Sequence, residues 1–107
     1  IQRAVKIDDK PLTIDEILEK VCNHFNVSVS AVNGRSRKQD LVTARQVSMY
    51  LAQKYTKMPA SRIGKLVGGR DHSTVIHSCS RIEQRLQVDS MFSNELMSIE
   101  NSFKLKN

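Results

Sequence analysis

The spacing of apolar positions along this chain predicts helices rather than strands. Apolar residues recur every three or four positions, and no run alternates between apolar and polar residues long enough to indicate a strand. The first helical segment starts at Thr13, which forms a Thr-x-x-Glu capping box with Glu16. Its apolar stripe consists of Ile14, Ile17, Leu18, Val21, Cys22 and Phe25. This stripe predicts an amphipathic helix of about three turns.

A short helical turn and a long helix are expected next. Residues 28–34 fit one turn that is capped by Ser30 and ended by Gly34. The connector of residues 35–39 is basic and holds no apolar residue. Asp40 is a plausible cap for a helix that runs to Tyr55. One face of that helix carries Ala44, Val47, Leu51 and Tyr55, with Tyr50 beside them.

Two closely spaced helices follow, and then a final one. Pro59 suits the first position of a short helix that ends at Gly68-Gly69, and Asp71 caps the next. The core positions expected in this pair are Ile63, Leu66, Val67, Val75, Ile76, Cys79, Ile82 and Leu86. The last helix starts near Asp89 or Ser90, with Phe92, Leu96, Ile99 and Phe103 on one stripe. The prediction is an all-α fold of five to six helices, with a helix-turn-helix at about residues 59–86.

Length and charge narrow the class of protein. The 107 residues suffice for one domain, expected at residues 12–107, while the polar residues 1–11 fit a linker or the tail of a preceding helix. Because the chain starts at Ile1 without a signal-peptide pattern, we expect a fragment of a larger intracellular protein. Residues 35–85 hold 11 basic and 3 acidic residues, a net +8, whereas the flanks sum to −2. This distribution favours a surface that faces a polyanion.

Catalytic and metal-binding patterns are weak in this sequence. Cys22 and Cys79 each fall on an apolar helix side and are expected to be reduced core thiols. His72 and His77 are five residues apart, so they do not share the i, i+4 face of a metal pair. No Gly-x-x-x-x-Gly-Lys-Ser/Thr phosphate loop is present. His72 and Ser73 are neighbours on a helix and do not face each other. We therefore expect neither an enzyme nor a bound metal or cofactor.

The same polar residues fit contacts with DNA. Asp71 can accept from a cytosine amine, His72 can donate to a base, and the hydroxyls of Ser73 and Thr74 suit a base or a phosphate. Arg37, in the basic connector, suits a narrow minor groove. Two alternatives stay open: Asp71 acts only as an N-cap, and Arg81 and Arg85 form only a solvated helix face.

The segment after the short helix resembles the signature of a known family. It reads Gly68-Gly69-Arg70-Asp71-His72-Ser73-Thr74-Val75-Ile76-His77. This run is similar to the C-terminal DNA-binding domain of the bacterial chromosomal replication initiators, the DnaA family. The upstream runs Arg35-Ser36-Arg37-Lys38 and Ala44-Arg45-Gln46-Val47-Ser48-Met49-Tyr50-Leu51, together with Ile63-Gly64, resemble it too. The likeness covers about residues 13–85.

The resemblance implies a Trp-repressor-like helix-turn-helix that binds short duplex elements at the replication origin. It assigns base contacts to Arg37, Asp71, His72 and Ser73. It assigns phosphate contacts to Arg45, Gln46, Lys54, Lys57, Ala60, Ser61, Thr74, His77 and Arg81, with Lys54 and Lys57 as the weaker members. Two positions depart from the family: Ser73 replaces a usual Thr and loses a methyl contact worth about 1 kcal/mol, and Ala44 replaces a frequent Pro.

The resemblance also indicates what this chain leaves to other parts of its parent protein. ATP and Mg are expected only in an ATPase module outside the sequence, which would also contact other initiator copies. Lipid contact would belong only to the parent, and the fragment is expected to be monomeric in a bacterial cytoplasm, at the nucleoid. Two alternatives remain: a dimeric helix-turn-helix transcriptional regulator on a palindrome, and a helical module that binds proteins or a membrane surface.

Overall fold

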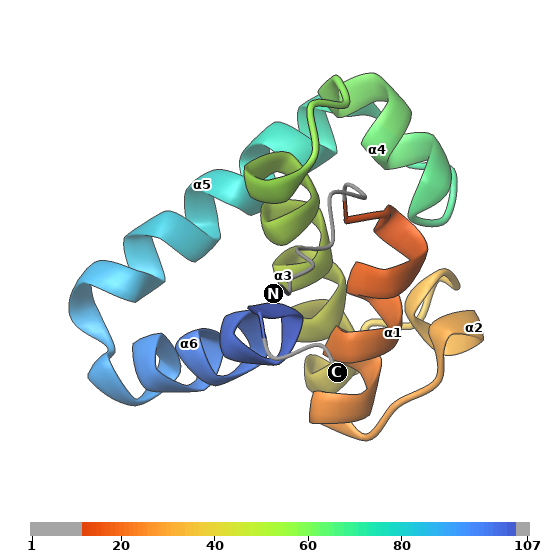
Figure 1. The fold of residues 1–107 in the computed structure, drawn as a ribbon. Helices are drawn as coiled ribbons and strands as arrows, with labels where there is room; N and C mark the ends of the chain where they lie inside the picture. Colours follow the sequence, from red (N-terminus) through yellow and green to blue (C-terminus); the bar gives the residue numbers. More distant parts are fainter. Residues whose placement is uncertain (1–11, 105–107) are drawn as a thin grey trace, which may run out of the picture.

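The computed structural model describes residues 12–104, which form six helices and no strand. The helices are α1 (Ile14–Phe25), α2 (Val29–Val32), α3 (Gln39–Tyr55), α4 (Ala60–Leu66), α5 (His72–Val88) and α6 (Ser90–Lys104). In Figure 1, α3 runs through the middle of the molecule, with α1 and α2 on one side and α5 and α6 on the other. The all-α prediction is confirmed. The expected linker of residues 1–11 lies outside the described residues.

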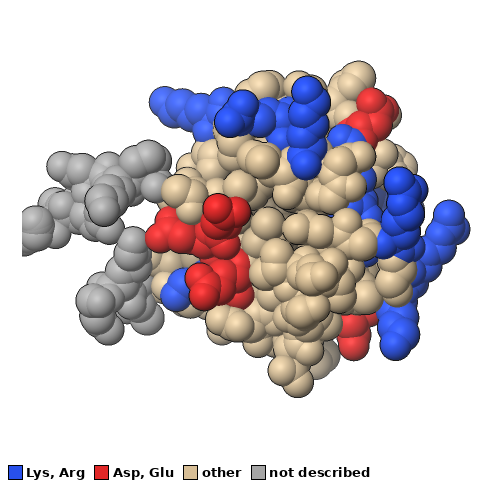
Figure 2. Space-filling model, turned by 90° about the vertical axis from the view of Figure 1, so that its right-hand side faces the viewer, with Lys and Arg blue, Asp and Glu red and all other residues tan. Residues whose placement is uncertain are grey.

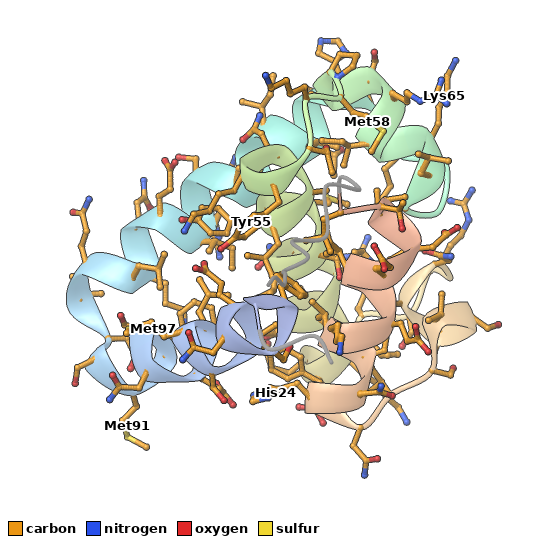
Figure 3. The ribbon with its side chains drawn as sticks, viewed as in Figure 1. His24, Tyr55, Met58, Lys65, Met91 and Met97 are labelled. Atoms are coloured by element: carbon orange, nitrogen blue, oxygen red, sulfur yellow. The ribbon has the colours of Figure 1, made fainter. Side chains whose placement is uncertain are left out.

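The core surrounds α3, which contacts α1, α2, α4 and α5, while α6 covers α1 and α5. Fully enclosed side chains come from five helices and include Ile17, Val32, Met49, Leu51, Ile63 and Val75. Each large apolar side chain buried in this way contributes roughly 1.5–3 kcal/mol to folding. The stripe expected on α6 (Phe92, Leu96, Ile99 and Phe103) is buried, whereas Met91 and Met97 are exposed, and Met91 extends outward from α6 (Figure 3). Cys22 and Cys79 are free and buried, as predicted.

Some helix ends lie where the sequence predicts them, and others lie elsewhere. The capping box at Thr13 is present, because the Thr13 hydroxyl accepts from the Glu16 amide at 3.2 Å and Glu16 accepts from the Thr13 amide at 3.1 Å. Ser28, not Ser30, caps α2: its hydroxyl accepts from the Ala31 amide at 3.1 Å, which starts the helix two residues earlier than expected.

The start of α3 also differs from the expectation. Lys38 takes the N-cap position without a side-chain hydrogen bond, and Asp40 lies within the first turn, where its charge suits the helix dipole. The helix α4 begins one residue later than predicted, so Pro59 is its N-cap rather than its first helical residue. Proline lacks the amide hydrogen that a helix start leaves unpaired, so either position tolerates it.

Two residues expected in the core face outward. Leu66 is 39% exposed, because Val67 at the C-cap of α4 fills the adjoining core position completely. Ile76 is 53% exposed, since it lies one residue, about 100° around the helix, from the enclosed Val75. The core side of α5 is formed by Val75, Cys79 and Ile82, as expected.

Candidate nucleic-acid interface

A tight turn places α5 directly after α4 and completes the helix-turn-helix. Gly68 and Gly69 adopt left-handed backbone angles, with φ of 79° and 69°, which glycine accepts without the steric cost of a Cβ. The Arg70 amide then donates to the Gly64 carbonyl at 2.6 Å. A Cβ at Gly64 would overlap the Arg70 backbone, so the close approach of the turn to α4 requires glycine there.

The start of α5 presents four short polar side chains to solvent. Asp71, the N-cap, and the next three residues, His72, Ser73 and Thr74, are all exposed. Asp71 is the N-cap residue, and its carboxylate accepts a hydrogen bond from the Ser73 hydroxyl. This hydrogen bond and the nearby His72 imidazole, 3.5 Å away, hold the pKa of Asp71 below its ordinary value. The tip therefore offers a carboxylate acceptor beside imidazole and hydroxyl groups.

The outward face of α5 continues this polar surface. His77 and Arg81 are both exposed, at about one-turn intervals after Ser73. Arg81 lines an open groove between α5 and α3, and Gln39 and Gln46 lie on the α3 side of the groove. The structure thus brings together Gln46 and Arg81, two residues predicted to contact phosphate. The positive end of the α5 dipole adds a further attraction for anions at the tip.

The loop of residues 35–38 carries the second candidate reading element. The side chains of Arg35, Arg37 and Lys38 are exposed. Arg37 has no hydrogen-bond or ion-pair partner among residues 12–104, so its guanidinium is free to bind a ligand. The loop is nevertheless held at its base, because Arg45 donates to the carbonyls of Val32, Gly34 and Ser36 at 2.8, 3.3 and 3.1 Å.

Two of the predicted phosphate contacts are engaged elsewhere in the structure. Arg45 is only 9% exposed and is bound to the loop carbonyls. Burial lowers the pKa of Arg45 from its ordinary value. Lys54 forms an ion pair with Glu100 of α6 at 3.0 Å, and Tyr55 also donates to Glu100 at 2.9 Å. The contacts predicted for Arg45 and Lys54 stay predictions, and this geometry gives them no support.

Positive charge gathers over the loop and α4. Lys57, Arg62 and Lys65 are exposed, and Lys65 extends outward from α4 (Figure 3). Ser61 is exposed and Ala60 half-buried at the start of α4. Figure 2 shows Lys and Arg side chains along the upper and right edges of one face, while most of that face's acidic side chains lie at the left. This separation suits a polyanion on one side of the molecule.

Sequence reasoning missed Arg70 as part of this interface. Its side chain donates to the Val67 carbonyl at 2.8 Å and to the Gly34 carbonyl, 36 residues earlier. The only signal in the sequence was its place directly after the paired glycines. A contact between residues so far apart along the chain depends on how α2 and α4 are placed by the core.

Metal-ligating clusters and membrane-spanning helices are both absent from residues 12–104. Residues 12–104 contain no group of three or more His, Cys, Asp or Glu side chains placed to hold a metal ion. Among the same residues, no helix combines the length and apolar character needed to cross a bilayer.

Comparison with known proteins identifies the family. Residues 14–82 match the model of the bacterial DnaA protein helix-turn-helix. The chain is 43% identical over 106 residues to the chromosomal replication initiator protein DnaA of Bacteroides thetaiotaomicron, covering 99% of this chain and 23% of that protein. It is 41% identical to the DnaA protein of Bacteroides fragilis, over 100% of this chain and 22% of that protein, and 39% identical to that of Porphyromonas gingivalis, over 86% and 20%.

The chain thus spans about a quarter or less of the length of these relatives. The match takes in α1 to α4 and most of α5, including the paired glycines and the polar tip. This match and the arrangement of the helices show that the chain belongs to the bacterial DnaA helix-turn-helix family.

Proposed function

We propose that this chain is the sequence-specific duplex-DNA-binding domain of a bacterial chromosomal replication initiator, and that its targets are short boxes at the replication origin. The observation that carries the proposal is the exposed run from Asp71 to Thr74 at the start of α5. A helix that projects short polar groups from its N-terminal end, closely preceded by a second helix, has the geometry of a major-groove reader. The family match and the relatives named as chromosomal replication initiators support the assignment.

The proposed contacts divide between bases and the DNA backbone. Asp71, His72 and Ser73 read base edges in the major groove, and Arg37 enters the adjacent minor groove. Phosphates are held by Thr74, His77, Arg81 and Gln46, and by Lys57 and the start of α4 at Ala60 and Ser61. These backbone contacts set the register in which the base-reading groups meet their edges.

The remaining roles of the parent protein lie outside this sequence. We propose that the chain itself is non-catalytic and binds no cofactor, and that ATP, Mg and other initiator copies bind elsewhere in the parent. The chain acts as a monomer in the bacterial cytoplasm, at the nucleoid. Any lipid contact belongs to the parent protein.

Selection followed by competition tests the proposal. The protein is used to enrich duplexes from a pool randomised over about one helical turn, and affinity is then measured for the enriched duplex and a scrambled one. We expect clear preference for the enriched duplex. His72→Ala should lower this preference by about 1–3 kcal/mol, whereas Arg81→Ala should weaken both duplexes alike. Equal binding of the two duplexes at physiological salt by the unsubstituted protein would overturn the proposal.

A further inference from the structure

Two arginine side chains converge on one backbone oxygen at the base of the basic loop. The Nη2 atoms of Arg45, from α3, and of Arg70, from the turn before α5, both donate to the carbonyl of Gly34. Arg70 also donates through Nη1 to the Val67 carbonyl at 2.8 Å, at the end of α4. A chain of hydrogen bonds therefore joins α4, the turn and the loop.

We call the hydrogen bonds from Arg70 to the Val67 and Gly34 carbonyls the tether, and the atoms around it are closely packed. A Cβ at Gly68 would overlap the Arg70 guanidinium and would lie 2.5 Å from the Asn33 carbonyl oxygen. The turn thus packs directly against the residue that precedes Gly34. Because Arg70 is adjacent to Asp71 and Gly34 is adjacent to Arg35, this contact joins the two candidate reading elements over very few covalent bonds.

The two guanidinium groups at the Gly34 carbonyl, those of Arg45 and Arg70, carry positive charge that no described acidic side chain pairs with. Among residues 12–104, neither Arg45 nor Arg70 forms an ion pair with a carboxylate. Burial, followed by the charges of Arg45 and Arg35, lowers the pKa of Arg70. Three guanidinium groups gathered in this way repel one another, and a nearby phosphate backbone would relieve that repulsion.

We infer that Arg70 is a positioning residue that acts through the Gly34 carbonyl to fix where Arg37 lies relative to the base-reading end of α5. The inference rests on the proposed function, since it concerns how two grooves of one site are read together. A loop fixed before binding loses less conformational freedom when it meets DNA. Arg70 need not contact a base to influence the preference that Arg37 provides.

A double-mutant cycle tests this role. Affinity for the enriched and scrambled duplexes is measured for the unsubstituted protein, Arg70→Met, Arg37→Ala and the double variant. If Arg70 acts by placing Arg37, Arg70→Met should reduce the preference for the enriched duplex roughly fivefold or more. The same substitution should change it little when Arg37 is already absent. Lys20→Met, which removes one exposed charge on α1, is the matched control and should keep the preference.

Arg70→Lys separates geometry from charge. A lysine keeps the positive charge but has one nitrogen in place of the planar fork, so it does not reproduce the geometry in which two nitrogens each donate to a different carbonyl. It should lose preference as the methionine variant does, and it decides the matter if the methionine variant does not fold. Thermal unfolding followed by circular dichroism sets the assay temperature below the midpoint of every variant.

The outcomes distinguish the inference from the proposed function. If the unsubstituted protein shows no preference, the proposed function fails. If the unsubstituted protein shows preference and Arg70→Lys keeps that preference, the positioning role is overturned. The role is also overturned if the double variant loses preference by the product of the two single losses, those of Arg70→Met and Arg37→Ala. Multiplying losses would identify Arg70 as a separate DNA contact.

Discussion

At the scale of single residues, the Ser73 hydroxyl favours the ionised form of Asp71 at the start of α5. It donates to the Asp71 carboxylate, and a hydrogen bond to the charged form of an acid stabilises that form. Asp71 therefore stays an ionised acceptor to a lower pH than an ordinary aspartate. An acceptor at this position suits the exocyclic amine of cytosine, and the lone proton of the Ser73 hydroxyl can be redirected when a base arrives.

Replacement of Ser73 by alanine should raise the pKa of Asp71 towards its ordinary value, because the first cause of its depression is removed. A carboxyl-carbon NMR titration of the unsubstituted and Ser73→Ala proteins measures this change. Since the folded pKa is depressed, any stability that the interaction provides is present above the ordinary pKa and is lost as the pH falls through the folded value. An Asp71 pKa that is unchanged by Ser73→Ala would contradict this account.

The residue types alone predict some of these positions, and they leave the structural contacts of others unforeseen. The exposed polar groups from Asp71 to Thr74 follow from the apolar spacing around them, because the core side of α5 was recognisable. Arg45 did not reveal its structural role, since a basic residue after a basic loop looks like a phosphate ligand. Its commitment to three backbone carbonyls depends on the path of the loop, which the one-dimensional pattern does not contain.

At the scale of elements, the turn between α4 and α5 controls the geometry of the site. Gly68 and Gly69 both have positive φ, but their surroundings differ: a Cβ at Gly68 would meet Arg70 and Asn33, whereas nothing lies within 4 Å of one at Gly69. An alanine at Gly69 would thus carry only the cost of the left-handed backbone, whereas an alanine at Gly68 would carry that cost and a steric clash as well. Helix existence and the turn were predictable here, whereas this difference between adjacent glycines was not.

Gly69→Ala should lower the free energy of unfolding by about 1–2 kcal/mol, the cost of a left-handed conformation. Gly68→Ala should cost more, because its methyl group also displaces the Arg70 guanidinium. Urea unfolding of both variants followed by circular dichroism provides the comparison. Equal destabilisation of the two variants would show that the space around Gly68 is not restricted as described.

Helix boundaries show the same limit of prediction from sequence. The capping box at Thr13 is a local signature, and the structure confirms it. Ser28 and Ser30 are both acceptable caps by residue type, and the choice between them depends on where α2 packs against α1 and α3. Likewise, the outward direction of Leu66 depends on Val67 reaching the core from the C-cap, beyond the helical repeat.

At the scale of the whole molecule, the charge distribution and the fold agree on one binding side. Exposed cations come from segments that are separate in sequence: the loop of residues 35–38, the region around α4, and α5. The core brings these segments together, while Glu100 pairs with Lys54 at the contact between α3 and α6. A protein arranged in this way should bind duplex DNA largely by displacing counterions.

Binding should therefore weaken steeply with salt, with log K falling by about 0.9 for each phosphate neutralised. Arg81→Ala should reduce the slope by about one unit, since it removes one of the proposed phosphate contacts, whereas Lys20→Met on α1 should leave the slope unchanged. Affinity measured over a series of salt concentrations gives the slopes. A shallow slope shared by all three proteins would contradict an interface based on phosphate contacts.

The central claim is that one chain reads both grooves of one short duplex, the major groove with the start of α5 and the minor groove with Arg37. Methylation protection tests it directly, because guanine N7 lies in the major groove and adenine N3 in the minor groove. On an enriched duplex we predict one contiguous, asymmetric footprint with protection in both grooves. His72→Ala should relieve chiefly the major-groove protection, and Arg37→Ala chiefly the minor-groove protection. Protection of a single groove, or a symmetric pair of footprints, would contradict the account.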